Sequence, residues 1–227
     1  MPGHQSSEKT KALIMQAAIE FFSLQGFHAT TIADICTKAG TNIASVKYHY
    51  GNKQALYVEA WREAFRLSHE RHPIYGGVAK EAPAEERLRG WIVARLRRIV
   101  DPECHDFEMF HKELSSPTGY LYDAMKEAIE PIIESLNDVI QELLGETARR
   151  DDVRLCEMSI HSQCMNPMIM DMRESWSHHG PHVPKPPSLG VDIEQIADHI
   201  IRFSLDGIMG IRRHLEAGVE EKNSKIC

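Results

Sequence analysis

Residues 30–53 constrain the fold more than any other part of the sequence. Thr31 and Asp34 have the spacing of a helix N-cap and its capping-box partner. Gly40 ends the helix that they start, because glycine tolerates the positive φ that a tight turn requires. The helix after it carries polar and aromatic side chains where a core helix would carry leucines. Two short helices joined in this way are typical of a helix-turn-helix that reads DNA.

The second of these helices, residues 43–50, is expected to rest one face on the protein and the other on DNA. Asn42 can cap its N-terminus. The side chains expected to face inward are Ile43, Val46 and Tyr50. On the other face Lys47 can donate to guanine edges or phosphate, and the small Ser45 lets the helix lie deep in the groove. Phosphates can be bound by hydroxyl, imidazole and ammonium groups. These groups are expected at the groove wall and at the N-termini of the flanking helices. The predicted DNA contacts are Thr31, Asn42, Ser45, Lys47, Tyr48, His49 and Lys53.

Apolar residues recur at helical spacing along the rest of the chain, and no segment shows the alternation of a strand. The expected helices cover residues 9–24, 53–68, 85–100, 103–114, 121–144, 151–176 and 192–217, with loops at 72–83 and 180–190. Gly26 is expected to end the first of them. The predicted fold class is therefore all-α. It has an N-terminal three-helix helix-turn-helix domain at residues 1–55 and a larger helical effector-binding and dimerisation domain at residues 56–227.

The charge distribution indicates that one copy of the helix-turn-helix domain, here called the reader, binds DNA weakly. The whole chain has a formal net charge of −7. Residues 1–60 carry five basic and four acidic side chains, about +1, and the remaining 21 basic and 29 acidic residues give −8. Local rather than global charge decides phosphate contact. Useful affinity is therefore expected to depend on two copies acting together.

The last two predicted helices carry the dimer hypothesis. Residues 192–217 combine an apolar stripe with the small residues Ser204, Gly207 and Gly210, which allow close helix packing. The residues predicted at the dimer interface are Ile160, Cys164, Ile200, Phe203, Gly207 and Ile211. A two-fold dimer matches a palindromic operator in double-stranded DNA. The alternative is that both helices belong to the core of a single chain.

Methionine and aromatic side chains in the body suit an adaptable apolar pocket for a small-molecule effector. The candidate pocket residues are Trp91, Phe107, Phe110, His111, Tyr122, Met125, His161 and Met165. The alternative for each of them is plain core, and a lone histidine on an apolar face is commonly a hydrogen-bonded core residue.

We expect no bound metal, no cofactor and no enzymatic role. The chain has 13 histidines, among them the pair His69 and His72 and a cluster at His178, His179 and His182. No cysteine or carboxylate stands near them at a recognisable ligand spacing. The sequence also lacks the HExxH, GxSxG, Walker and Rossmann motifs.

The remaining composition favours the cytoplasm. The five cysteines are odd in number and form no CxxC pair, which argues against a disulfide framework. The N-terminus lacks the apolar segment of a signal peptide, and no apolar run approaches the roughly 18 residues of a membrane span. No membrane partner is expected.

The first sixty residues resemble the TetR family of transcriptional regulators. The matching residues are Ala17-Ala18, Phe21-Phe22, Gly26-Phe27, Thr30 to Ile35, Ala39-Gly40, Tyr48-His49-Tyr50 and Asn52 to Leu56. In that family the positions of Thr31, Ser45, Lys47, Tyr48, His49 and Lys53 commonly touch DNA. Lys47 stands where many members have tyrosine.

The body resembles a subgroup with a CerR-type C-terminal domain. The resemblance rests on Phe110 to Leu114, Pro117-Thr118, Ile129-Glu130-Pro131, Leu143-Leu144-Gly145 and Cys156 to Cys164. It implies a one-component regulator tied to drug export or stress. The resulting hypothesis is a homodimeric repressor released by an effector. The alternative is a metal-sensing regulator, or a protein-interaction module with a non-functional helix-turn-helix.

Overall fold

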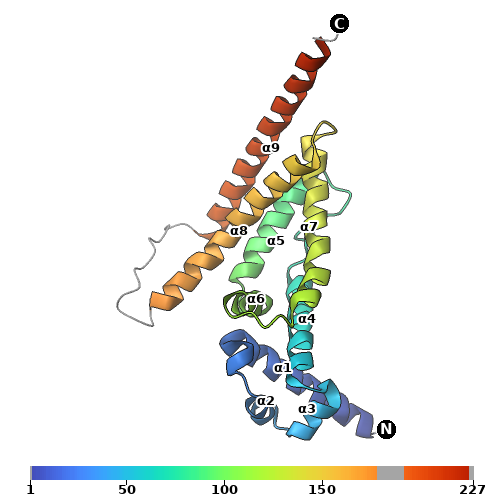
Figure 1. Cartoon of the computed structure of the whole chain (residues 1–227), viewed down its shortest axis with the longest axis vertical. Coiled ribbons are helices and arrows are strands. Elements are labelled where there is room, and N and C mark those ends of the chain that lie inside the picture. The colour runs from blue at the N-terminus through green and yellow to red at the C-terminus, as the bar shows by residue number, and fades with distance from the viewer. Residues whose placement is uncertain (1, 178–191, 225–227) are drawn as a thin grey trace. The chain divides into compact units, whose positions relative to one another are not determined.

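The fold is described from a computed structural model of the chain. The structure describes the backbone of residues 2–177 and 192–224 and the side chains of residues 7–166 and 192–218. All regular secondary structure in these residues is α-helical, which confirms the predicted class (Figure 1). The helices are α1 (Pro2–Ala29), α2 (Ile32–Ala39), α3 (Ile43–Tyr50), α4 (Lys53–Arg71), α5 (Ala84–Val100), α6 (Asp106–Ser115), α7 (Tyr122–Leu144), α8 (Arg150–Ser177) and α9 (Ile193–Ser224). The segment 180–190 and the cluster His178, His179 and His182 lie outside the described residues.

Helix α1 is broken at Gly26, the residue at which the sequence predicts that the first helix ends. The backbone leaves helical geometry at this residue, with φ 76° and ψ 176°, and is helical again up to Ala29. Only glycine adopts such a φ without strain. A Cβ added to Gly26 would lie 3.5 Å from Lys112 Cβ, an ordinary contact distance, so the positive φ rather than a lack of space favours glycine here.

Contacts between the helices divide the chain into two compact units. The first holds the chain up to Arg71 together with Pro102–Ile129. The second holds His72–Asp101 and the chain from Glu130 on. Helix α4 lies entirely in the first unit. The domain boundary predicted at residue 55 separates a DNA-binding part from an effector-binding part. Contacts between helices do not test such a division, so this boundary stays a proposal.

Aromatic rings join α1 to α4 in the first unit. The ring centroids of Phe22 and Tyr57 lie 4.8 Å apart, and those of Phe27 and Tyr57 lie 5.1 Å apart. Ile14 and Trp61 are buried in the same core. Burying one such side chain contributes about 1.5–3 kcal/mol. This core, rather than the short helices α2 and α3, therefore supplies most of the stability on which the helix-turn-helix rests.

A buried carboxylate connects α6 and the loop after it to α4. Glu113 accepts from the Tyr57 hydroxyl at 3.1 Å. It also accepts from the Thr118 hydroxyl and from the N–H groups of Thr118 and Gly119, each at 2.9 Å. Burial, and next this carboxylate, raise the pKa of Tyr57, so its hydroxyl stays a donor. A buried charge is tolerated only with such partners. Glu113 therefore holds the 116–121 loop to α4.

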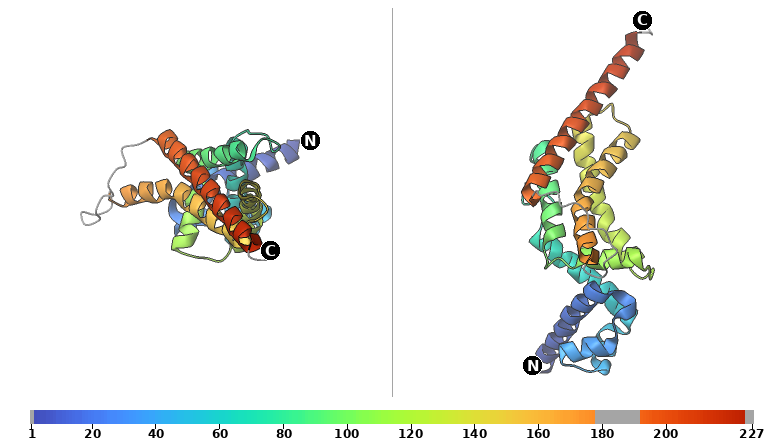
Figure 2. Two further views of the ribbon diagram at one scale, coloured as in Figure 1. Left: turned by 90° about the horizontal axis from the view of Figure 1, so that it is seen from above. Right: turned by 90° about the vertical axis from the view of Figure 1, so that its left-hand side faces the viewer.

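The second unit contains α5, α8 and α9 side by side (Figure 2). The loop predicted at 72–83 is confirmed, and it packs onto this unit at Gly90. A Cβ on Gly90 would lie 2.2 Å from Tyr75 O, so only glycine fits there. The Tyr75 hydroxyl donates to Ser135 O of α7 at 3.2 Å. The loop therefore connects α5 and α7.

We expect Gly90→Ala to lower the free energy of unfolding by about 2 kcal/mol, because overpacked sites cost about 1–3 kcal/mol. Urea unfolding followed by circular dichroism measures the change. The matched control is Gly218→Ala on α9, where an added Cβ meets no atom within 4 Å and alanine favours the helix. Equal stability of Gly90→Ala and the wild type would contradict the close packing of the loop on α5.

Candidate nucleic-acid interface

Helix α2 is capped at both ends as the sequence predicts. Thr31 Oγ1 accepts from the Asp34 N–H at 3.1 Å, and the Thr31 N–H donates to Asp34 Oδ2 at 3.3 Å. Gly40 ends the helix in the left-handed region, with φ 62° and ψ 36°. The N–H of Thr41 then donates to Cys36 O at 2.9 Å. The capping box and the glycine turn are therefore confirmed.

Helix α3 is held by a cap and by two inward side chains. Asn42 Oδ1 accepts from the Ser45 N–H at 3.0 Å, so the predicted cap is confirmed. Val46 is buried, and Tyr50 is half-buried. The Tyr50 hydroxyl donates to Lys11 O of α1 at 2.9 Å. These contacts fix which side of α3 is left open.

The prediction that Ile43 faces inward is wrong, because its side chain is 61% exposed. Ile43 lies one turn before Lys47, and Ala44 lies one turn before Tyr48, so the helical period places these four exposed residues on one side. We call them the α3 face. Sequence reasoning missed Ile43 and Ala44, although an apolar contact with a thymine methyl group is a known form of base recognition.

The predicted contacts divide between the α3 face and its surroundings. Lys47 and Tyr48 belong to the α3 face, and Tyr48 is 80% exposed. Ser45 and His49 are half-buried on the other side of the helix. The Thr31 hydroxyl is exposed but already donates to Asp34 Oδ2 at 2.6 Å.

Lys53 stands at the start of α4 with its ammonium group over an aromatic ring. Its Nζ lies 4.2 Å from the centroid of Phe27. Burial lowers the pKa of Lys53 from its ordinary value. Lys38 is paired with Glu20 at 2.7 Å, so its charge is already offset within the protein. The reader is therefore poorer in available positive charge than its composition indicates.

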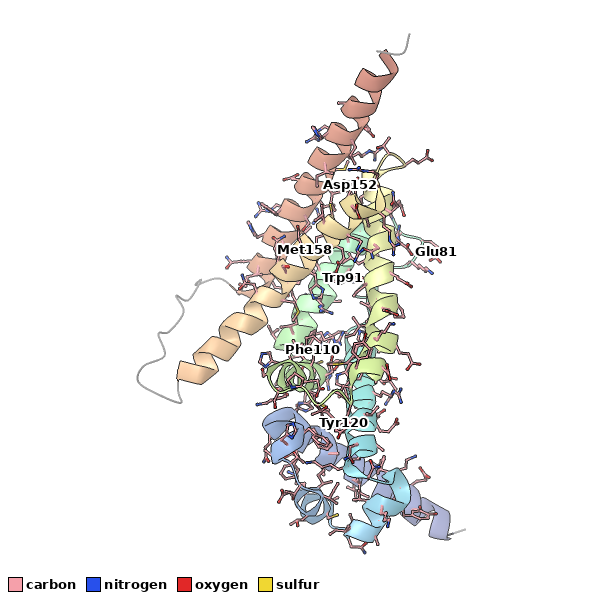
Figure 3. All side chains as sticks on the ribbon, in the orientation of Figure 1. Glu81, Trp91, Phe110, Tyr120, Asp152 and Met158 are labelled. Carbon is pink, nitrogen blue, oxygen red and sulfur yellow. The ribbon has the colours of Figure 1, made fainter. Side chains whose placement is uncertain are left out.

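The predicted dimer residues fall into two groups within the second unit. Ile160, Cys164 and Ile200 are buried in the single chain, as the alternative of a monomer core requires. Phe203, Gly207 and Ile211 are exposed along one side of α9, and Phe203 is 61% exposed. Two further apolar residues of α8, Leu155 and Met158, are also exposed, and the second of them is labelled in Figure 3.

The predicted pocket residues belong to both units. Trp91, His161 and Met165 are in the second unit, and the other five are in the first. Trp91 and Phe107 are buried, whereas Tyr122 is exposed. A hollow of about 470 Å³ opens between α7 and α8, and none of the predicted residues lines it. Its lining residues are Glu130, Ile133, Glu134, Asn137, Asp138, Gln141, Arg150, Val153 and Arg154.

His161 has polar surroundings between α5 and α8. Its Nδ1 lies 3.8 Å from Glu157 Oε1. Arg95 of α5 donates to Met165 Sδ at 3.4 Å. Burial, and next the charge of Arg95, lower the pKa of His161 to about 4. The imidazole is therefore neutral at pH 7.

The two histidines considered for metal binding have different neighbours. His69 Nδ1 lies 2.9 Å from Phe65 O, one turn earlier in α4. His72 Nε2 lies 2.8 Å from Asp101 Oδ2.

None of the described helices has the length and hydropathy that a transmembrane span requires.

An all-α chain that presents a short capped helix ahead of a larger helical body has the architecture of helix-turn-helix regulators. Comparison with known proteins agrees. Residues 14–60 match the family model "Bacterial regulatory proteins, tetR family". Residues 84–208, more than half of the chain, match "HTH-type transcriptional dual regulator CecR, C-terminal domain". The chain belongs to the TetR family of transcriptional regulators, which bind DNA, and its body is of the CecR type, the subgroup that the sequence analysis gives as CerR-type.

Individual relatives are distant. The regulator CecR of Shigella flexneri is 26% identical over 73% of this chain and 76% of its own length. The regulator SrpR of Pseudomonas putida is 23% identical over 60% of this chain, and the match spans 61% of SrpR, less than two thirds of that relative. The solved structure of a transcriptional regulator from Pseudomonas aeruginosa PAO1 has a TM-score of 0.67 at 19% identity, over 90% of this chain and 93% of that one. This likeness shows the fold.

The environment of His161 predicts how stability depends on pH. The native pKa, about 4, is below the ordinary value of 6.5. Below pH 6.5 the unfolded chain therefore takes up a proton that the native protein does not, and stability falls as the pH drops towards 4. We expect His161→Gln to lose less thermal stability between pH 7 and pH 5 than the wild type. Thermal melts at both pH values measure this, and parallel losses in the two proteins would contradict it.

Proposed function

We propose that the protein is a homodimeric repressor that binds a palindromic operator and leaves it when a small-molecule effector binds the body. The observation that carries the proposal is the α3 face. It offers an exposed lysine and tyrosine on a helix capped by Asn42 and anchored by Val46. Such a helix fits the major groove, where side chains meet base edges. A repressor of this class acts in the cytoplasm.

The proposed dimer uses the exposed apolar side chains of α8 and α9. Leu155 and Met158 on α8 and Phe203 and Ile211 on α9 are all exposed in the single chain. Pairing them with a second copy removes apolar surface from water, which is worth about 25 cal/mol per Å². Two copies also double a reader that has little positive charge of its own. The proposed interface centres on Phe203, Gly207 and Ile211, and the buried Ile160, Cys164 and Ile200 support it from within each chain.

Control by an effector follows from the geometry of the operator. Two half-sites lie about 34 Å apart along one turn of DNA, so a small change in the separation of the two α3 helices lowers affinity. We place the effector in the 85–175 body. The eight pocket candidates named from the sequence remain candidates for its site. Nothing in the relatives' names supports the metal-sensing or vestigial alternatives.

We expect the double variant Lys47→Ala/Tyr48→Ala to abolish operator binding while the protein stays folded and dimeric. Four contacts are lost per dimer, and at about 1 kcal/mol or more each the Kd rises by about a thousandfold. Gel shifts at physiological salt, on the DNA upstream of the protein's own coding region, measure the loss. Lys126→Ala is the control on α7. Retention of operator affinity by the double variant would mean that α3 does not read the operator.

We expect Phe203→Asp to convert the dimer into monomers and to weaken operator binding along with it, because a charge cannot be buried unpaired at an apolar interface. Light scattering after size exclusion gives the mass. The control is Leu67→Asp, which places the same charge at another exposed, large apolar residue, but in the first unit. A Phe203→Asp protein that remains dimeric would place the interface elsewhere.

A further inference from the structure

One hydrogen bond attaches α1, at Lys11, to the C-terminal end of α3. Tyr50 is the last residue of α3, and its hydroxyl donates to Lys11 O at 2.9 Å. Burial, and next the charges of Glu59, Glu63 and Glu8, raise the pKa of Tyr50 to about 12. The hydroxyl therefore keeps its proton and remains a donor at physiological pH.

Lys11 lies on the side of α1 that packs on the core, one turn before that core begins. Ile14 and Ala18 are buried, and they follow Lys11 at the spacing that places residues on one side of a helix. Lys11 itself is exposed. Lys9 is also exposed, but it lies on the opposite side of α1, one turn before the exposed Leu13.

Few cations of the reader are available to DNA. Lys38 is paired with Glu20, and the Lys53 ammonium lies over the Phe27 ring. The other three lysines of residues 1–60 are Lys9, Lys11 and Lys47. None of them forms an ion pair within the described residues. Phosphate contacts by such cations supply much of the affinity of a DNA-binding protein. The placement of Lys11 therefore matters more than in a strongly basic domain.

The length of α3 places its end beside the DNA backbone. The helix has 8 residues, which at 1.5 Å per residue span about 12 Å, close to the width of the major groove of about 12 Å. Recognition helices contact bases through their N-terminal residues. The C-terminal end, where Tyr50 holds Lys11, then lies at the groove wall, where the phosphates run.

We propose that Lys11 contacts a DNA phosphate beside the C-terminal end of α3, and that Tyr50 is the positioning residue that holds α1 in place for this contact. The proposal rests on the proposed function, because it requires α3 to lie in the major groove. It assigns the part of α1 around Lys11 to the interface as a second element, in addition to the helix-turn-helix.

The test is the salt dependence of DNA binding by the full-length dimer. Each phosphate contact contributes about 0.9 to the slope of log K against log salt. Lys11→Ala removes one contact per subunit, so the slope falls by about 1.8, and the loss of affinity between 50 and 200 mM salt becomes about 12-fold smaller. The probes are an operator duplex from the upstream region and a random duplex of equal length. The change should appear on both, because a phosphate contact carries no sequence information.

Lys9→Ala is the matched control, since it removes the same charge from the other side of α1 and should leave the slope unchanged. Tyr50→Phe removes only the hydroxyl, so Lys11→Ala should change the slope less in that background. Circular dichroism melts check that each variant is folded.

Three results would overturn the inference. Equal slopes for Lys11→Ala and Lys9→Ala would exclude the contact. A loss of stability without a change of slope would mean that Lys11 only offsets Glu8, Glu59 and Glu63. An undiminished effect of Lys11→Ala in the Tyr50→Phe protein would remove the positioning role. Failure of the wild type to bind the operator would instead contradict the proposed function, and the inference with it.

Discussion

The first unit depends on Tyr57, because this one side chain joins three helices. Its ring packs on Phe22 and Phe27 of α1, and its hydroxyl donates to Glu113 of α6. Helices α2 and α3 have 8 residues each, and isolated helices shorter than about 12–15 residues are marginal in water. They persist because caps close their ends and because α1 and α4, fixed to each other around Tyr57, give Ile35 and Val46 a core to enter.

The same aromatic rings connect the 116–121 loop to the DNA side of the unit. The ring centroid of Phe27 lies 5.1 Å from that of Tyr120 in the loop and 4.2 Å from Lys53 Nζ. A movement of the loop therefore alters the surroundings of a predicted phosphate contact without passing through α2 or α3. In the proposed mechanism, an effector that displaces α6 would reach the proposed DNA interface through these rings.

Local signals in the sequence predicted the caps and the turn of the helix-turn-helix, and tertiary contacts account for what they missed. The capping box at Thr31, the Gly40 turn and the Asn42 cap involve residues near each other in the chain, so their spacing suffices. The exposure of Ile43 was missed because hydrophobicity suggests burial, whereas the orientation of α3 is set by Val46 and by the distant contact of Tyr50 with Lys11. At Gly26 the sequence correctly places the break in α1, whereas the short helical continuation to Ala29 was not predicted.

The carboxylate of Glu113 also bears on how this protein can change over evolutionary time. Aspartate is too short to reach the same donors, and glutamine would turn one acceptor into a donor facing them. Leu114, the next residue, is exposed and has no such demands. Among relatives of this protein, amino-acid substitutions should therefore be frequent at position 114 and rare at position 113. Where Glu113 does change, Tyr57 and Thr118 should change with it, so the three positions would be inherited as a set.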